Sequence, residues 1–237
     1  MTDEQRPVTP IVEAIAPWMH ALAGATRAGL AGLTRVRVEG ADRIPREGPV
    51  IIAANHASNL DPVVVGASLM PKMGRRLQWL GKRELFDWPV VGWIARNGGV
   101  HAVDRSTADV EAYRLAKRIL DEGHALFVFP EGTRSPDGTL QHARDGVAVL
   151  ALRTGAPIVP VGIVGSYARW PRGQKVPHPG GRVTIRVGSP FRLVDMLPAG
   201  TDRKAAKGLA TDLIMRRIAA LLPEPQRGAY AEPPTGF

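Results

Sequence analysis

Residues 50–62 read VIIAANHASNLDP, in which five apolar residues are followed at once by polar ones. The apolar run, Val50 to Ala54, does not alternate with polar residues, which is typical of a strand buried on both faces of a sheet. Residues 125–129 read ALFVF and form a second run of this kind, closed by a proline. Strands of this type occur in α/β proteins, where helices cover both faces of the sheet.

Shorter apolar segments and helical patterns alternate along the rest of the chain. Further strands are predicted at residues 36–38, 77–80, 158–163 and 183–187, and helices at residues 106–122, 146–153 and 202–222. The first of these helices opens with Ser106 and Asp109, which have the spacing of a capping box, and stops at Gly123. We therefore expect an α/β fold with a mixed, largely buried sheet flanked by helices.

The two ends of the chain differ from this pattern. Residues 1–33 are predicted to form a flexible lead and an amphipathic helical element, which packs on the core or lies in a membrane interface. Residues 34–222 form the α/β domain. Residues 223–237 contain four prolines and are predicted to be a disordered tail. The apolar stripe of the helical element consists of Ile11, Ile15, Trp18, Leu22 and Ala25.

Composition limits the classes of partner. The 237 residues include 31 Lys and Arg against 22 Asp and Glu, a formal net charge of +9, which suits nucleic acid, anionic lipid or phosphorylated substrates. Aromatic residues make up 5% and do not alternate with basic ones, so we expect no nucleic acid partner. The absence of cysteine excludes disulfides and a thiol nucleophile, and the scattered histidines predict no metal site.

No segment is predicted to span a membrane. Residues 11–33 are the longest apolar-rich stretch, but charged residues and a proline interrupt them. The first ten residues are polar and do not fit a secretory signal. We therefore expect a peripheral protein at the cytoplasmic face of a membrane.

A histidine and an aspartate follow the first buried strand, where α/β proteins bind their ligands. The carboxylate of Asp61 can fold back to one ring nitrogen of His56, fix its tautomer and leave the other nitrogen as a base for a substrate hydroxyl. The alternative is structural, with the histidine at a strand end and the aspartate at a helix N-terminus.

Polar residues also follow the second buried strand. Residues 129–138 read FPEGTRSPDG and place Glu131, Gly132, Thr133 and Arg134 at the same edge of the sheet. Glycine permits close approach of a ligand, and arginine can bind a phosphate with two hydrogen bonds. Alternatively, the segment is a tight turn with a surface arginine. A third segment, residues 98–105, reads GGVHAVDR and ends in Arg105.

Together these segments resemble the ordered motifs of the glycerolipid acyltransferase family. The resemblance covers about residues 34–190, and the segment at residues 82–92 is similar to the family's usual link between the first two motifs. The four motifs are N-H-x-x-x-x-D at residues 55–61, G-V-x-x-V-x-R at 99–105, F-P-E-G-T-R-S at 129–135 and V-P-V at 159–161.

The resemblance implies an O-acyltransferase. It would move a fatty acyl group from acyl-CoA or acyl-carrier protein to the hydroxyl of 1-acyl-sn-glycerol 3-phosphate, giving phosphatidic acid. His56 would be the general base and Asp61 would orient it, so that the acceptor oxygen attacks the thioester without an acyl-enzyme. No metal or tightly bound cofactor is implied, because acyl-CoA or acyl-carrier protein is a cosubstrate.

The resemblance also implies which residues bind substrate. Arg105 would hold the acceptor phosphate and Arg134 would lie near it, while Glu131, Gly132 and Thr133 would shape the acceptor pocket. The strand at residues 159–161 would line the acyl side. Two segments depart from the usual motifs. His101 and Ala102 replace bulkier apolar residues, and Arg144 stands where lysine is frequent and keeps its charge.

Other functions remain open on the sequence. The acceptor could be another lysophospholipid, glycerol 3-phosphate or a glycolipid. The same His–Asp pair could hydrolyse the thioester, or the protein could be a non-catalytic lipid-binding or carrier-binding protein. Residues 72–83 contain five basic residues and no acidic residue before Glu84, which predicts either a peripheral membrane anchor or a solvated basic loop.

Overall fold

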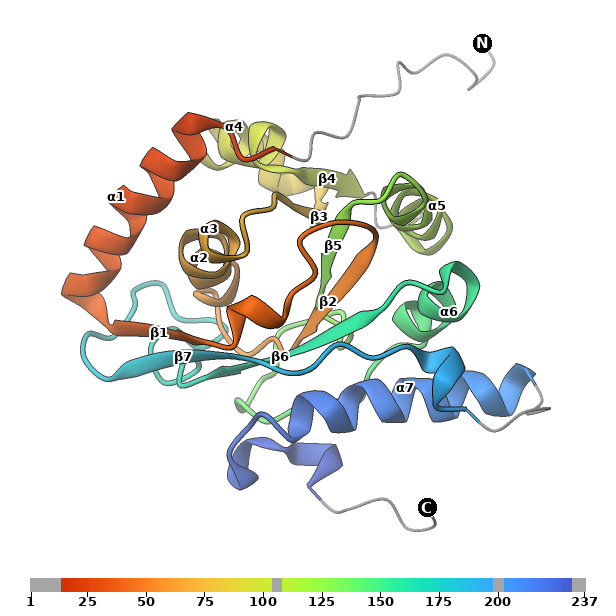
Figure 1. The fold of residues 1–237 in the computed structure, drawn as a ribbon. Helices are drawn as coiled ribbons and strands as arrows, with labels where there is room; N and C mark the ends of the chain where they lie inside the picture. Colours follow the sequence, from red (N-terminus) through yellow and green to blue (C-terminus); the bar gives the residue numbers. More distant parts are fainter. Residues whose placement is uncertain (1–13, 104–107, 198–202, 232–237) are drawn as a thin grey trace.

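The computed structural model describes residues 14–103, 108–197 and 203–231 (Figure 1). A seven-stranded sheet runs through the molecule in the order β1-β7-β6-β2-β5-β3-β4. Its strands are β1 (Arg35–Glu39), β2 (Val50–Ala54), β3 (Leu77–Lys82), β4 (Val100–Val103), β5 (Ala125–Val128), β6 (Ile158–Val164) and β7 (Arg182–Val187).

Five of the strands run in one direction. The pairs β6–β2, β2–β5, β5–β3 and β3–β4 are all parallel, whereas β6 and β7 are antiparallel and β7 is parallel to β1. The carboxyl ends of β2, β3, β4, β5 and β6 therefore point to one edge of the sheet. We call it the carboxyl edge. The mixed sheet of the sequence prediction is confirmed.

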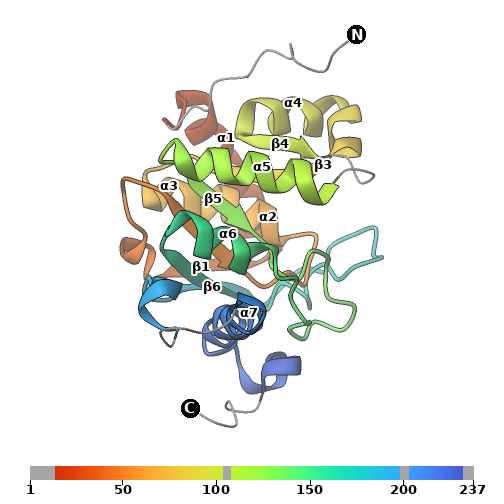
Figure 2. The same cartoon turned by 90° about the vertical axis from the view of Figure 1, so that its right-hand side faces the viewer.

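Helices cover both faces of this sheet (Figures 1 and 2). On one face lie α1, α2, the π-helix η3 and α3, and on the other lie α5, α6 and α7. α4 packs beside β4 at the end of the sheet. Their bounds are α1 (Pro17–Leu33), α2 (Asp61–Val64), η3 (Val65–Leu69), α3 (Met70–Met73), α4 (Pro89–Gly98), α5 (Ala108–Asp121), α6 (Gly146–Thr154) and α7 (Arg203–Ala219).

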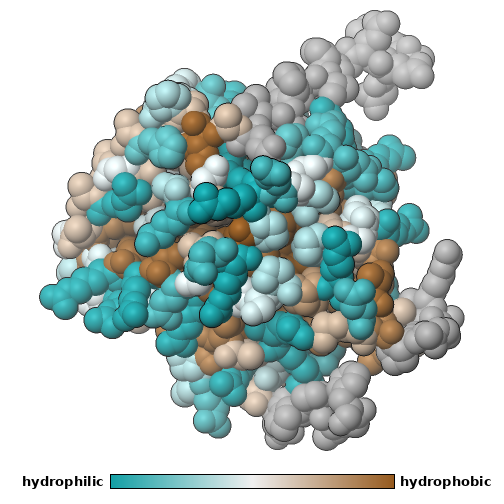
Figure 3. Space-filling model, viewed as in Figure 1, coloured by the Kyte–Doolittle hydropathy of each residue, from teal (hydrophilic) through white to brown (hydrophobic). Residues whose placement is uncertain are grey.

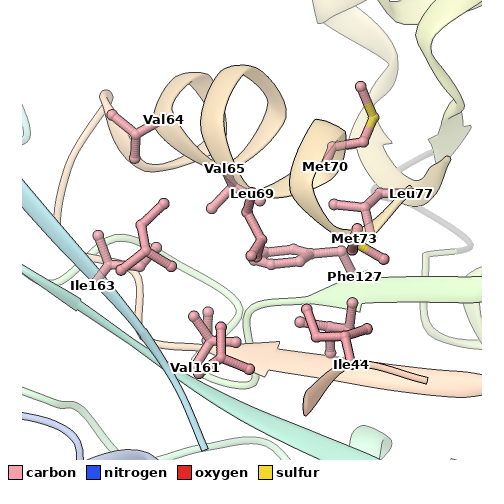
Figure 4. Packing of buried hydrophobic residues seen from close by; sticks show 14 of the residues in the cluster. Ile44, Val64, Val65, Leu69, Met70, Met73, Leu77, Phe127, Val161 and Ile163 are labelled. Carbon is pink, nitrogen blue, oxygen red and sulfur yellow. The ribbon is translucent and has the colours of Figure 1, made fainter. Parts of the chain in front are cut away.

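The central strand β2 has a separate hydrophobic core on each of its faces. Val50, Ile52 and Ala54 contribute to one core, and Ile51 and Ala53 to the other, so all five side chains are fully buried. This explains why the run has no polar alternation. Figure 4 shows the first core, where side chains of α2, η3 and α3 lie over Phe127 of β5 and over β6.

The sequence prediction missed β4 and α4. β4 has four residues, lies at the end of the sheet and is not fully buried at any position, so it lacks the continuous apolar pattern of β2. α4 begins at Pro89, and its larger apolar side chains face outward, which hides the usual signal of a buried helix face. The 3₁₀ segment η4 (Arg83–Asp87) connects β3 to α4.

The N-terminal helix forms as predicted, but its most deeply buried residues are not those of the predicted stripe. Met19, Ala23 and Leu30 of α1 lie in the core. Ile15 and Trp18 of the expected stripe are half-buried and pack against this core. Leu22 is also half-buried and Ala25 is exposed, while residue 11 lies outside the described residues. No helix within the described ranges is both long and apolar enough to cross a membrane.

The segment after α7 corrects the prediction of a disordered tail that begins at residue 223. Residues 223–231 form two 3₁₀ turns, η6 (Glu224–Gln226) and η7 (Gly228–Tyr230). They pack because Tyr230 is buried and because Leu140 exchanges backbone hydrogen bonds with Gln226 and Ala229, at 2.9 and 3.2 Å. Residues 232–237 lie outside the described part of the chain.

The basic run at residues 72–83 does not form one surface, which corrects the hypothesis that its charges act together. Arg75 is buried, and its guanidinium donates to the carbonyls of Pro45 and Gly123 at 3.1 and 2.9 Å. Lys72 precedes β3 and Lys82 ends it, so the exposed charges lie at opposite edges of the sheet.

Candidate active site

The loop after β2 is fixed to the neighbouring strand by Asn55. Its buried amide donates to the carbonyl of Ile163 in β6 at 3.0 Å and accepts from the N–H of the same residue at 2.7 Å. The chain therefore leaves the sheet at a defined point. The next residue, His56, lies at the carboxyl edge beside the end of β5.

Asp61 is the first residue of α2 and is completely buried. Its Oδ2 atom accepts three hydrogen bonds, from Nδ1 of His56 at 2.9 Å and from the backbone N–H groups of Ala57 and Ser58 at 2.8 and 2.7 Å. The predicted pairing of His56 and Asp61 is thus present. A carboxylate on Nδ1 places the imidazole proton on that atom and leaves Nε2 as the proton acceptor.

The imidazole of His56 is held in place by an aromatic ring. It stacks on Phe129 with the ring centroids 3.9 Å apart and the planes 12° apart. The His56 side chain is 17% exposed, and within the described part of the chain no group is hydrogen-bonded to Nε2. One nitrogen is therefore fixed, and the other has its lone pair available to accept a proton.

The hydroxyls of the two serines near the dyad are hydrogen-bonded to groups other than His56. The hydroxyl of Ser58 donates to the carbonyl of Trp170 at 2.7 Å and accepts from the N–H of Leu60 at 3.0 Å. The hydroxyl of Ser135 donates to Asp137 at 3.0 Å. Neither serine is hydrogen-bonded to His56, so neither has the arrangement of an activated nucleophile.

Glu131 connects the two loops of the site. It is buried, with Oε1 accepting from the N–H of His56 at 2.6 Å and Oε2 accepting from the N–H of Gln141 at 2.8 Å. Burial raises the pKa of Glu131 to about 7, although both hydrogen bonds favour the ionised form. Both oxygens hold backbone groups, so Glu131 positions the loop that carries His56.

The remaining predicted residues of this motif lie around that connection. Gly132 adopts a φ of 68°, and a Cβ there would lie 3.3 Å from Nε of Arg144. Thr133 is exposed, and Arg134 is half-buried. Arg144 is exposed, and its N–H donates to the carbonyl of Pro130 at 3.0 Å. Two arginines thus flank the loop, whereas the predicted Arg105 lies outside the described residues.

A comparison with known proteins identifies the family. A model of the acyltransferase family matches residues 35–164, more than half of the chain. The chain belongs to the acyltransferase family. The match begins at β1 and ends with β6, so it contains His56, Asp61 and the whole loop of Glu131.

Individual members of the family are similar over part of their length. A chloroplastic 1-acyl-sn-glycerol-3-phosphate acyltransferase of Brassica napus is 30% identical over 129 residues, 54% of this chain and 36% of that protein. A lyso-ornithine lipid O-acyltransferase of Pseudomonas aeruginosa is 35% identical over 127 residues, 53% and 45% of the two chains. The chain therefore spans less than half of the length of these curated relatives.

A solved structure shares the fold over most of the chain. It is the crystal structure of the 1-acyl-sn-glycerophosphate (LPA) acyltransferase PlsC from Thermotoga maritima. The TM-score is 0.66 at 26% identity, and the match covers 86% of this chain and 79% of that one.

The sequence motifs of this acyltransferase do not show which residues hold the His56 loop in position. Phe129 lies within the third motif, but only the structure shows its ring against His56. Trp170 lies outside every motif, and its carbonyl accepts from both Ser58 and the N–H of Asn59, the latter at 3.2 Å. The strand at residues 159–161 is buried in β6. No cluster of three potential metal ligands occurs in the described ranges.

Proposed function

We propose that the chain transfers a fatty acyl group from acyl-CoA or acyl-carrier protein to the hydroxyl of 1-acyl-sn-glycerol 3-phosphate, giving phosphatidic acid. The observation that carries the proposal is the pair of His56 with the buried Asp61, in which Nδ1 lies 2.9 Å from the carboxylate and Nε2 has no hydrogen bond among the described residues. The names of the Brassica napus and Thermotoga maritima relatives support this acceptor.

The proposed reaction consists of two proton transfers and an acyl transfer from sulfur to oxygen. Nε2 of His56 takes the proton of the acceptor hydroxyl while its oxygen attacks the thioester carbonyl. The C–O bond forms, the C–S bond breaks, and the departing thiolate receives the proton from His56. The carboxylate of Asp61 stabilises the positive imidazolium between these steps. The chemistry requires no metal or redox cofactor.

Direct attack by the acceptor is favoured over a covalent acyl-enzyme. The chain contains no cysteine, and the hydroxyls of Ser58 and Ser135 are hydrogen-bonded to other groups. The nucleophile in the proposed reaction is therefore the substrate oxygen. Hydrolysis would use the same base with water in place of the lipid hydroxyl, and it is an outcome of the test below.

The acceptor is proposed to be phosphorylated. Arg134 and Arg144 lie on the loop that begins at Phe129, and a guanidinium group binds phosphate oxygens with paired hydrogen bonds. Arg105, Gly132 and Thr133 are proposed to contribute to the same acceptor site. Because acceptor and product are lipids, the proposal includes a peripheral position at the cytoplasmic face of a membrane.

A second acceptor class follows from one comparison. The Pseudomonas aeruginosa relative is named for a lyso-ornithine lipid, and it is more similar per residue than the Brassica napus relative. The same dyad would acylate a hydroxyl of such a lipid, since the base does not contact the head group. Only the contacts to the arginines would differ.

The experiment is an endpoint assay with palmitoyl-CoA or palmitoyl-acyl-carrier protein, read by mass spectrometry. Lysophosphatidic acid, lyso-ornithine lipid, glycerol 3-phosphate and water are compared as acceptors. We expect phosphatidic acid from the wild type, a rate lower by roughly 10²–10⁴-fold for His56→Ala, and little change for His20→Ala, an exposed histidine of α1. Undiminished turnover in folded His56→Ala would contradict the role of the base, and free fatty acid alone would indicate a hydrolase.

A further inference from the structure

A cluster of large apolar side chains is exposed on η4 and α4. Its members, which we call the η4–α4 patch, are Leu85, Trp88, Val90, Val91 and Trp93. Trp88 is 66% exposed, Val90 71% and Trp93 51%. Soluble domains expose single apolar residues commonly, but five within nine residues indicate a surface that is covered by a partner.

The packing of α4 explains why these side chains face outward. Gly92 and Ala95 are the buried residues of the helix. A Cβ at Gly92 would come within 2.3 Å of the carbonyl oxygen of Phe86, so η4 packs closely against that face of α4. Val90 and Trp93 lie on the opposite, exposed face of α4. The ring of Trp93 also contacts Trp18 of α1, with the ring centroids 4.8 Å apart.

The η4–α4 patch begins at the same edge of the sheet as the dyad, and α4 leads from there back to the start of β4. η4 directly follows β3, and His56 follows β2, which is two strands away in the order β2-β5-β3. Adjacent strands are about 4.8 Å apart, so the two strand ends are separated by roughly 10 Å. Figure 2 shows the segments that follow β3, β5 and β6 projecting from one side of the molecule.

A basic loop lies on the other side of the dyad. Residues 165–182, which follow β6, carry four Arg and Lys residues and no acidic residue. Pro171 of this loop forms a β-bridge with Ser58, and Nη1 of Arg172 lies 3.5 Å from the carbonyl oxygen of Arg134. Val176 at the middle of the loop is 69% exposed. The basic residues are Arg169, Arg172, Lys175 and Arg182.

We propose that the carboxyl edge docks on an anionic lipid bilayer, with the η4–α4 patch inserted at the level of the head groups and the basic loop against the lipid phosphates. Tryptophan is favoured at this depth because its ring is apolar and its N–H is polar. Basic residues add attraction to an anionic surface. The inference rests on the proposed function only in that the bilayer supplies the lysolipid acceptor to His56.

Among the described residues, the opposite edge of the sheet has no exposed tryptophan. It faces the viewer in Figure 3, where hydrophilic side chains interrupt the hydrophobic areas. Val194 and Met196 are exposed there, since η5 (Leu193–Asp195) follows the antiparallel strand β7. Lys72, which precedes β3, is exposed at the same edge. Val194 and Lys72 supply matched controls.

The test measures binding of the full chain to sucrose-loaded vesicles of phosphatidylglycerol and phosphatidylcholine by sedimentation. We expect binding that depends on phosphatidylglycerol. The affinity of the Trp88→Ser, Val90→Ser double variant should be lower by roughly tenfold or more, because it lacks two apolar side chains that the bilayer would partly bury. Lys175→Glu is expected to weaken binding by roughly fivefold to thirtyfold. Val194→Ser and Lys72→Glu are expected to bind as the wild type does.

Tryptophan fluorescence gives a second readout for the same vesicles. The emission of the wild type should shift to shorter wavelength on binding, and Trp88→Phe should reduce that shift. Unchanged vesicle binding by the Trp88→Ser, Val90→Ser double variant would overturn the proposal. An equal loss of binding in Val194→Ser would do the same, as would binding of acyl-carrier protein through this patch without any binding of vesicles.

Turnover separates this inference from the proposed function. With a short-chain lysophosphatidic acid that is monomeric in solution, the Trp88→Ser, Val90→Ser double variant should match the wild type. With a long-chain acceptor embedded in vesicles, it should be slower. Vesicle binding through the η4–α4 patch without turnover of either acceptor would refute the proposed function and still support the docking surface.

Discussion

The loop of His56 and the η4–α4 segment follow neighbouring parts of the same sheet edge, yet they are built in opposite ways. Asn55, Asp61 and Glu131 are buried around the first, and each forms hydrogen bonds to backbone groups. In the second, two tryptophans are more than half exposed. The first region fixes one atom, Nε2 of His56. The second presents an apolar surface whose exact geometry matters less.

This difference predicts where substitutions act. Changes in the His56 loop should lower turnover or stability, because each buried partner holds a polar group that has lost its contact with water. Outward-facing changes in the η4–α4 segment should act on membrane binding and leave stability within about 0.5 kcal/mol.

Asp61→Asn should give the largest effect. The amide oxygen can still accept from the N–H groups of Ala57 and Ser58, but its neutral group no longer stabilises a positive His56. We expect turnover to fall by about 10²–10⁴-fold with a small change in melting temperature. Kinetics and thermal unfolding of the same preparation check this. A variant that keeps full activity would remove Asp61 from the mechanism.

Glu131 should make stability depend on pH. Burial raises its pKa in the folded protein to about 7, above the ordinary value of 4.5. The folded state therefore binds this proton more tightly than the unfolded state does. The resulting contribution of Glu131 to the free energy of unfolding is fully present below about pH 4.5 and is lost as pH rises through about 7. The size of this pKa shift limits the contribution of Glu131 to the free energy of unfolding to about 3 kcal/mol.

Urea unfolding at several pH values measures this contribution. The wild type minus Glu131→Gln difference isolates it, because other titrating groups are common to both proteins. We expect the difference in unfolding free energy to decrease between pH 5 and pH 7.5. A difference that does not change with pH would show that Glu131 titrates at its ordinary value.

Asn55→Ala should reduce stability. The substitution leaves the N–H and the carbonyl of Ile163 without partners in a buried position. We expect a loss of about 2–4 kcal/mol in the free energy of unfolding, measured with urea. Asn59→Ala is the control, because the side chain of Asn59 is only half-buried. Equal stability of the two variants would show that the link to β6 contributes little.

Gly92→Ala should disturb the packed side of α4. Its new methyl group would meet the carbonyl oxygen of Phe86 at 2.3 Å, and η4 would have to move. We expect a cost of roughly 1–3 kcal/mol by chemical unfolding. Gly66→Ala in η3 is the matched control, since no atom lies within 4 Å of the added carbon there. A Gly92→Ala protein as stable as Gly66→Ala would contradict the close packing.

The sequence predicts the features that depend on neighbouring residues and misses those that depend on distant ones. Strand β2 was predictable because burial on both faces removes polar residues from it. His56 and Asp61 were predictable because a local turn brings residues five apart together. The role of Glu131 was not, since its hydrogen bond to His56 joins positions 75 residues apart.

Two other features of the fold could not be predicted from the sequence. The outward apolar face of α4 carries no signal of burial, so the helix was missed. The ordered turns after α7 depend on Tyr230 and on backbone pairs with Leu140, while the prolines around them suggested disorder. In both cases the deciding contact is tertiary, and a local pattern does not contain it.

In the proposed reaction the acceptor oxygen, activated by Nε2 of His56, takes the acyl group directly. The most direct measurement is the intact mass of the protein, with release of CoA, after incubation with palmitoyl-CoA alone and again after addition of lysophosphatidic acid. We expect an unmodified protein throughout and CoA release only with the acceptor. A protein that gains one acyl group and passes it to the acceptor would contradict direct transfer.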